Sequence, residues 1–259
     1  VSSSFVSRLP HLNGRLRCMQ LRFIYTNMPF WRAEVSRIAL FIGDVEFEDL
    51  RIDRKEFLRA KEFGKLDDGT VMPFHQMPVL VVDGTSIAQT GGIARFCGKL
   101  AGLYPTDDHL KAAQIDQFID FATDLNTMVS STNQTKDEEQ KLAARLKLAN
   151  GPLKRKLGML ERLIPEGSDW IVPPSISIAD IAIWSWYGAL VLGRLYDAEE
   201  FLDVKTYKNV LRWAKEINDR QAVKRGIMVN KIKGNPSSQL HERHSSSDFI
   251  HKTQDKLEK

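Results

Sequence analysis

Residues 76–93 read Gln-Met-Pro-Val-Leu-Val-Val-Asp-Gly-Thr-Ser-Ile-Ala-Gln-Thr-Gly-Gly-Ile. Pro78 opens an apolar run after a loop, which is unusual for a strand unless the Met77–Pro78 bond is cis. A cis bond would turn the Met77 amide and carbonyl toward a ligand, where they can pair with an extended backbone as an added strand. Asp83-Gly84 is a hairpin signal. A helix that begins at Gln89-Thr90 would offer free amides to a carboxylate.

The segment upstream predicts a strand, a helix, a second strand and a second helix, at residues 21–26, 33–42, 45–52 and 54–63. The strands alternate apolar and polar residues, and glycines stop both helices. A β-α-β unit of this length implies two parallel strands. Strands at 78–82 and 85–88 and a helix at 89–100 complete the order of a thioredoxin-like fold. Taken singly, Pro78 could be an edge-strand proline and Thr90 a plain helix cap; this order of elements favours the binding interpretation.

Beyond residue 102 the pattern changes from mixed to helical. Residues 103–109 are a short linker, and helical spacing follows at 112–128, 138–164, 178–196 and 207–219. We therefore predict an α/β domain at 19–102 and an all-α C-terminal domain at 110–230. Residues 231–259 are polar, and we expect an irregular tail that is partly docked, because Leu240 and Phe249 need burial.

The first eighteen residues are rich in serine and contain arginines but no acid. We interpret residues 1–18 as a disordered or spurious extension, because Met19 directly precedes the first strand-like run. The competing interpretation is an organelle transit peptide. Mass spectrometry of the native protein tests the first interpretation, since an intact N-terminus at Val1 contradicts it.

Composition argues against several classes of protein. The net charge is +4, but Lys and Arg are interleaved with Asp and Glu, so no basic stripe for nucleic acid is present. No run reaches the roughly 20 apolar residues of a membrane span. Cys18 and Cys97 show no disulfide or zinc-ligand spacing. No acid or cysteine completes a ligand set with His241, His244 and His251, so we expect no metal.

Residues 20–105 resemble the N-terminal, glutathione-binding domain of the glutathione transferases, nearest to the sigma-like branch that uses a tyrosine. The matching segments are 23–28, 32–37, 47–51, 76–80 and 102–105. In the helical half, Ser177-Ile-Ala-Asp180 resembles the capping box with which the family begins a buried helix, so we assign Ser177 and Asp180 to structure. The tail at 239–249 is similar to that of some bacterial members. The resemblance implies the glutathione transferase fold.

The resemblance also implies that Tyr25 is the catalytic hydroxyl. A thiol with a pKa of about 8.5 is mostly protonated at neutral pH, and a phenol that donates a hydrogen bond to the sulfur stabilises the thiolate. The alternative is a strand aromatic at the edge of the core. Because the turn at 28–31 is one residue longer than is usual in this branch, Thr26 or Asn27 could meet the sulfur instead.

A set of glutathione-binding residues follows from the same resemblance: Arg32, Phe57, Lys61, Gln76, Met77, Pro78, Gln89, Thr90 and Asp124. Phe57 stands where the family often has tryptophan, so one side-chain donor is missing. Asp124 corresponds to an acid that reaches the γ-glutamyl ammonium of glutathione bound in the partner subunit, which requires a homodimer. A position on a solvated helix face is the alternative explanation for Arg32, Lys61 and Asp124. Trp184, Trp186 and Tyr187 lie on the buried helix, and we expect them in the core.

The sequence thus predicts a transferase that activates the thiol of glutathione, its co-substrate, for attack on small electrophiles. A glutathione-dependent isomerase or peroxidase, or a non-catalytic binding protein on the same fold, is the alternative. We expect a detoxifying homodimer with no nucleic-acid or membrane partner. Two unpaired cysteines suit a reducing compartment, so we expect it in the cytoplasm.

Overall fold

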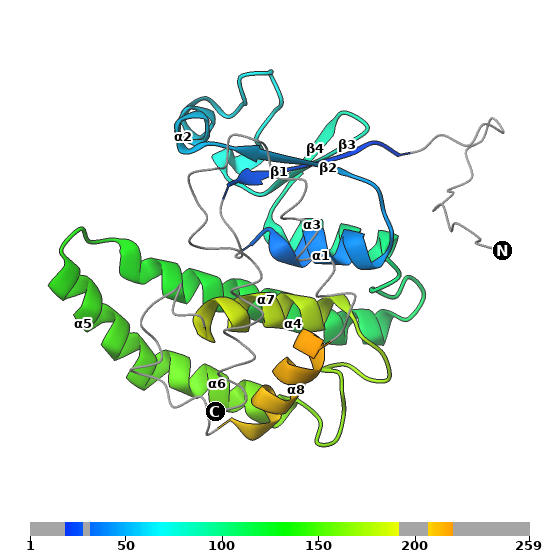
Figure 1. Cartoon of the computed structure of the whole chain (residues 1–259), viewed down its shortest axis with the longest axis vertical. Coiled ribbons are helices and arrows are strands. Elements are labelled where there is room, and N and C mark those ends of the chain that lie inside the picture. The colour runs from blue at the N-terminus through cyan, green and yellow to red at the C-terminus, as the bar shows by residue number, and fades with distance from the viewer. Residues whose placement is uncertain (1–18, 28–31, 192–206, 220–259) are drawn as a thin grey trace.

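The computed structural model describes residues 19–27, 32–191 and 207–219, and every structural statement below concerns these residues. The expectations for residues 1–18, for the turn at 28–31, for the tail at 231–259 and for Cys18 and the three tail histidines lie outside them. The described chain has a four-stranded sheet flanked by helices, followed by an all-helical half (Figure 1). This confirms the predicted fold class.

The sheet has the strand order β2-β1-β3-β4, formed by β1 (Leu21–Thr26), β2 (Glu48–Ile52), β3 (Val79–Val82) and β4 (Thr85–Ala88). β1 pairs in parallel with β2 and antiparallel with β3, as the predicted β-α-β and hairpin units require. β2 starts later than predicted. The Val45 amide donates to the Leu40 carbonyl at 2.9 Å and closes the end of the preceding helix, so Val45 is not in the ladder.

Helices α1 (Glu34–Ile42) and α3 (Thr90–Leu100) lie on one face of the sheet, and α2 (Arg54–Phe63) lies on the other (Figure 1). Each terminates at a glycine or beside one, as predicted. Gly64 adopts a left-handed conformation with φ 70°, which glycine tolerates without steric cost. At Gly43 an added Cβ would come within 2.4 Å of the Ala101 Cα, so the ends of α1 and α3 approach closely there.

Alternation along β1 divides the apolar residues between two cores. Phe23 and Tyr25 join the large core with α1 and α3, and Ile24 joins a small core under α2. The side chain of Tyr25 therefore points toward the helical half of the molecule.

The helical half contains α4 (His109–Ser130), α5 (Glu138–Leu148), α6 (Lys154–Leu163), α7 (Ile178–Val191) and α8 (Lys208–Asp219). The predicted helical spacing over 138–164 is confirmed through Leu163, but the segment is not one regular α-helix. A π turn at Ala149–Leu153 separates α5 from α6 and contains Pro152. Proline has no amide to donate and its ring crowds the carbonyl four residues before it, so a regular helix cannot continue there.

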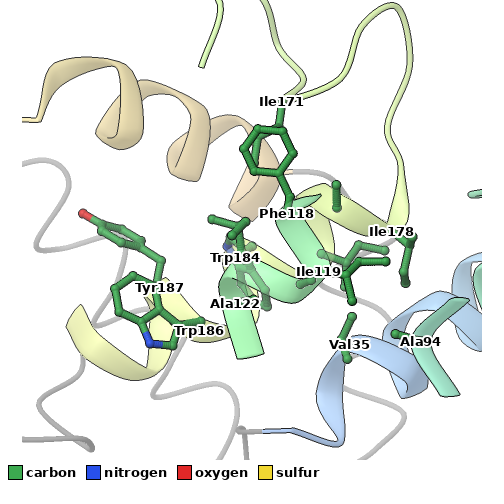
Figure 2. Close-up of a cluster of buried hydrophobic side chains, with 14 of the residues drawn as sticks. Val35, Ala94, Phe118, Ile119, Ala122, Ile171, Ile178, Trp184, Trp186 and Tyr187 are labelled. Atoms are coloured by element: carbon green, nitrogen blue, oxygen red, sulfur yellow. The ribbon is translucent and has the colours of Figure 1, made fainter. Parts of the chain in front are cut away.

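Helix α7 connects the two halves of the molecule. It contacts α1 and α3 of the α/β half and α4 and α8 of the helical half, and Ile178 donates its amide to the Leu103 carbonyl at 2.9 Å. Figure 2 shows Val35 and Ala94 from the α/β half packed toward Ile119 and Ile178 from the helical half. Trp184, Trp186 and Tyr187 are buried, as expected for core residues. No helix in the described ranges is long and apolar enough to cross a membrane.

Candidate active site

Tyr25 lies near the end of β1 with 6% of its surface exposed. Burial raises the pKa of its phenol to about 12, while the positive charges of Arg32 and Arg37 oppose that shift. The main chain of Arg32 also hydrogen-bonds the phenol oxygen. The hydroxyl is thus protonated at neutral pH. With its oxygen held by a main-chain amide, its own proton is free for a further acceptor.

A buried charge network lies beneath Tyr25. Arg37 is fully buried, and its Nη1 donates to Glu34 Oε1 at 3.0 Å and its Nε to Asp49 Oδ1 at 2.9 Å. Asp49 Oδ2 in turn accepts from Arg51 Nε at 2.9 Å. The Arg37 guanidinium lies 5.9 Å from the centre of the Tyr25 ring. These hydrogen bonds hold the Arg37 guanidinium in place against the ring of Tyr25.

Sequence reasoning missed this network. Glu34 and Arg37 have the i, i+3 spacing of a helical ion pair, but the same spacing is typical of solvated pairs. The usable signal is that both charges occur on the face of α1 that also carries Val35 and Ile38, which are buried.

The two alternatives to Tyr25 are less buried. Thr26 is half-buried at the end of β1, and Asn27 is exposed and donates its amide to the Ile52 carbonyl at 3.1 Å. The turn at 28–31 that would decide between the three lies outside the described residues. The choice therefore stays a prediction.

The Met77–Pro78 bond is cis, as the sequence predicts. Pro78 is buried and Met77 is half-buried beside the start of β3. Within the described residues, neither the amide nor the carbonyl of Met77 takes part in a main-chain hydrogen bond. This stretch of main chain is available to a ligand, and Gln76 beside it is exposed.

The start of α3 also has free amides. The helix begins at Thr90, and Gln89 at the cap position has φ 74° and makes no side-chain capping hydrogen bond. Gln89 is exposed and Thr90 is half-buried. The positive end of a helix dipole with unpaired amides favours an anion such as a carboxylate.

The remaining predicted binding residues are more scattered. Phe57 is half-buried against the small core, and Lys61 is exposed on α2. His75 Nδ1 donates to the Lys61 carbonyl at 2.9 Å, which ties the loop before β3 to α2. Asp124 is exposed on α4, with its carboxylate 4.0 Å from Lys156 Nζ. Of the predicted set, Tyr25 and Arg32 are directly linked to each other by a hydrogen bond.

A small cavity adjoins this region, between α1, α3, α4 and α7. Its volume is about 20 Å³, which is room for one water molecule. Among its lining residues are six with polar side chains: Arg32, Thr90, Thr123, Asn126, Ser185 and Trp186. Burial lowers the pKa of the Arg32 guanidinium. Asn126, Ser185 and Trp186 were not predicted as site residues, and Trp186 was expected only in the core.

Other chemistry is absent from the described residues or is buried too deeply to react. No group of three potential metal ligands occurs among them. Cys97 is buried, and burial raises the pKa of its thiol to about 12. A thiol in that state is a poor nucleophile, because the thiolate is the reactive form.

Two models of one family match the chain: the N-terminal domain of glutathione S-transferase at residues 21–98, and its C-terminal domain at residues 123–225. Disulfide-bond oxidoreductase YghU of Escherichia coli (strain K12) is 50% identical over 103 residues, which are 40% of this chain. The chain spans only 35% of the length of that relative. Glutathione S-transferase 2 of Caenorhabditis elegans is 28% identical over 171 residues, or 64% of this chain and 87% of that one.

Among solved structures, prostaglandin synthase D of Nilaparvata lugens superposes with a TM-score of 0.68 at 24% identity. The superposition covers 81% of this chain and 97% of that protein. At this identity the likeness concerns the fold alone.

Proposed function

The chain belongs to the glutathione S-transferase family, and we propose that it activates the thiol of glutathione for attack on small electrophiles. One observation carries the proposal: a protonated, buried phenol whose oxygen already accepts a main-chain hydrogen bond lies in the half of the molecule that also carries two unpaired main-chain sites. A tripeptide with a thiol and two carboxylates has the groups to use all three.

In this proposal different sets of binding residues contact different chemical groups of glutathione. The free main chain of Met77 pairs with the cysteinyl backbone as an added strand, with Gln76 and Pro78 beside it. The amides at the start of α3, with Gln89 and Thr90, take the γ-glutamyl carboxylate. Arg32 and Lys61 supply positive charge for the rest of the tripeptide, and Phe57 packs beside it. Asp124 reaches the ammonium group of glutathione in a partner subunit, so the active form is a homodimer.

Tyr25 stabilises the thiolate by donating its proton to the sulfur as a hydrogen bond. Because burial raises the pKa of the phenol to about 12, Tyr25 stays a donor through the neutral range instead of ionising in place of the thiol. The nearby guanidinium of Arg32 adds positive charge that favours the anion. Thr26 or Asn27 takes this role if the turn after β1 turns their side chains to the sulfur.

A redox reaction of glutathione is the second candidate, and the Escherichia coli relative named a disulfide-bond oxidoreductase favours it. Cys97 does not serve as the redox group, since its thiol is buried with a raised pKa. The bound thiolate of glutathione would then be the sulfur that exchanges. An isomerase or peroxidase reaction would use the same thiolate. We also propose a cytoplasmic location and a role in detoxification, in keeping with a glutathione-dependent reaction in a reducing compartment.

The test combines binding with the ionisation of the bound thiol. Titration calorimetry should detect glutathione binding, and the ultraviolet absorption of the thiolate should give an apparent pKa for bound glutathione below about 8.5. Tyr25→Phe should raise that pKa and lower kcat/KM for conjugation roughly 100-fold, with little change in glutathione affinity. Thr26→Val and Asn27→Ala are the matched controls.

The outcomes are distinct. Unchanged turnover in Tyr25→Phe together with a loss in Thr26→Val or Asn27→Ala moves the hydroxyl or amide role to that residue. A wild-type protein that binds no glutathione, or binds it with an unshifted thiol pKa, contradicts the proposed function.

A further inference from the structure

The loop before β3 holds two consecutive residues in a strained backbone conformation. Phe74 has φ 58° and His75 has φ 53°, in the left-handed region that residues other than glycine and asparagine rarely adopt. Such residues persist only where the surrounding contacts hold them. They directly precede Gln76 and Met77, which make no main-chain hydrogen bond within the described residues. The contacts of the loop therefore determine where this free main chain lies.

The imidazole of His75 contacts the end of α2 through both ring nitrogens. Its Nδ1 lies 2.9 Å from the Lys61 carbonyl oxygen, and because a carbonyl only accepts, Nδ1 carries the proton and donates. Lys61 lies in the last turn of α2, where carbonyls lack an intrahelical partner. His75 Nε2 lies close to Gly64, where an added Cβ would come within 2.6 Å of it. The end of α2 thus supplies both an acceptor and the space for the ring.

The main-chain hydrogen bonds of this loop end at His75. The Met72 amide donates to the Gly64 carbonyl at 2.7 Å, and the His75 amide donates to the Met72 carbonyl at 3.0 Å. The next main-chain hydrogen bonds are those of β3, which begins at Val79. Within the described chain, the bond from His75 Nδ1 is therefore the last hydrogen bond between α2 and the loop before the free main chain at 76–78.

We propose that His75 is a positioning residue for glutathione. Its hydrogen bond to α2 holds the main chain of residues 76–78 at a fixed place relative to Lys61, and this placement sets the affinity for the tripeptide. The inference rests on the proposed function of the site. Tyr25 lies on β1 and not in this loop, so His75 should affect the binding of glutathione and leave the ionisation of its thiol unchanged. A binding site that is already in place loses less entropy when the ligand binds.

Three variants of His75 separate the hydrogen bond from the backbone conformation. His75→Asn keeps both, because the asparagine Nδ2 is as many bonds from Cα as the histidine Nδ1, and asparagine tolerates a left-handed φ. His75→Ala removes the donor and keeps the backbone strain. His75→Gly removes the donor and relieves the strain. His75 is exposed, so all three variants should fold.

The test measures glutathione affinity and thiol ionisation in the same variants. Titration calorimetry should give a Kd for glutathione about 3- to 10-fold higher in His75→Ala and His75→Gly, and within about twofold of the wild type in His75→Asn. KM for glutathione should rise in parallel. The thiolate absorption should give the wild-type pKa for bound glutathione in all three, and kcat at saturating glutathione should stay within about twofold. A general loss of structure would lower kcat as well.

Asp67→Ala is the matched control. The exposed Asp67 carboxylate accepts from Arg59 Nε at 3.2 Å and from Arg59 Nη2, so it joins the same loop to the same helix farther from residues 76–78. This variant should keep the wild-type affinity for glutathione. Unchanged affinity in His75→Gly, an equal loss in His75→Asn, or an equal loss in Asp67→Ala contradicts the inference, while a shifted thiol pKa in the wild type still supports the proposed function. A wild-type protein that binds no glutathione overturns both.

Discussion

The phenol of Tyr25 lies between the sheet and α1, above the guanidinium of Arg37, and its surroundings decide its chemistry. Desolvation is the largest influence on its pKa, and it exceeds the opposing effect of two arginines. The result is a hydroxyl that resists ionisation. A donor that keeps its proton stabilises a neighbouring thiolate across the whole range in which the thiol ionises.

At the residue scale we predict the titration of Tyr25. Its pKa is about 12 in the folded protein and about 10 in the unfolded chain, so the folded state keeps the proton to higher pH. The stability from this difference, about 2–3 kcal/mol, is fully present below pH 10 and is lost as the pH rises through 12. The phenolate absorption of wild type minus Tyr25→Phe should therefore show a midpoint near 12. A midpoint near 10 would show that the phenol is solvated.

At the scale of elements, helix starts are stabilised in two different ways. Asp53, Asp108 and Asp137 each accept a hydrogen bond from an amide three residues later, at the exposed starts of α2, α4 and α5. The start of α8 is different: the Glu161 carboxylate of α6 accepts from the Asn209 and Val210 amides, both at 2.9 Å. This cap comes from a residue far away in the sequence.

Asp180 near the start of α7 combines both roles. Its Oδ2 accepts from the Ser177 amide at 2.8 Å and from the Ser177 hydroxyl at 3.0 Å, which is the returning half of a capping box. Its Oδ1 accepts from the Ile171 amide at 2.8 Å and from Trp213 Nε1 at 3.0 Å. The assignment of Ser177 and Asp180 to structure agrees with these contacts, and the carboxylate also holds α8 against α7.

We predict that Asp180→Ala lowers the free energy of unfolding by about 3–5 kcal/mol, because it leaves buried donors unpaired. Asp137→Ala, the matched loss of an exposed cap, should cost only about 1 kcal/mol. The loss in Asp180→Asn should be intermediate. The amide keeps one acceptor oxygen, but its NH₂ group is itself a donor and faces other hydrogen-bond donors. Chemical denaturation of the three variants measures the difference, and similar losses at both aspartates would contradict this account.

At the scale of the whole molecule, the two halves share one continuous core. Val35 and Ala94 belong to the same cluster of buried residues as Ile119, Ile178 and Trp184 (Figure 2). The division into domains at 19–102 and 110–230 stays a prediction. The shared core indicates that the two would not unfold independently, since separation would expose the apolar faces of α1, α3 and α7.

We predict a single unfolding transition. Four of the five tryptophans, Trp170, Trp184, Trp186 and Trp213, report on the helical half. Ile38→Ala in α1, where Ile38 is fully buried, should cost about 3 kcal/mol and shift tryptophan fluorescence and far-UV circular dichroism together. Ile217→Ala in α8 is the control from the other half and should do the same. A fluorescence transition that does not move in Ile38→Ala would show independent domains.

Much of the architecture follows from local pattern. The parallel β1–β2 pair, the hairpin at Asp83-Gly84, and the bounds of α2 agree with the sequence prediction, because alternation, turn residues and caps act within a few positions. The π turn inside the helical segment 138–164 was not predicted, although Pro152 is a local signal for it, because helical spacing continues on both sides. The role of Tyr25 was proposed by resemblance, whereas the free main chain at Met77 and at the start of α3 was predicted from the Met77-Pro78 pair and from the helix start at Gln89-Thr90.

The sequence by itself determined the order of the helices and strands, the division into an α/β half and an all-helical half, and the side chains that could bind or react. These features depend on neighbours along the chain. The tertiary structure alone decided which of these residues share an environment. It brought Arg37 beneath Tyr25, the Glu161 carboxylate to the start of α8, and the His75 imidazole to the end of α2. The physical reason is that pKa values and hydrogen bonds depend on burial and on distances between groups far apart in the sequence, and only packing sets these.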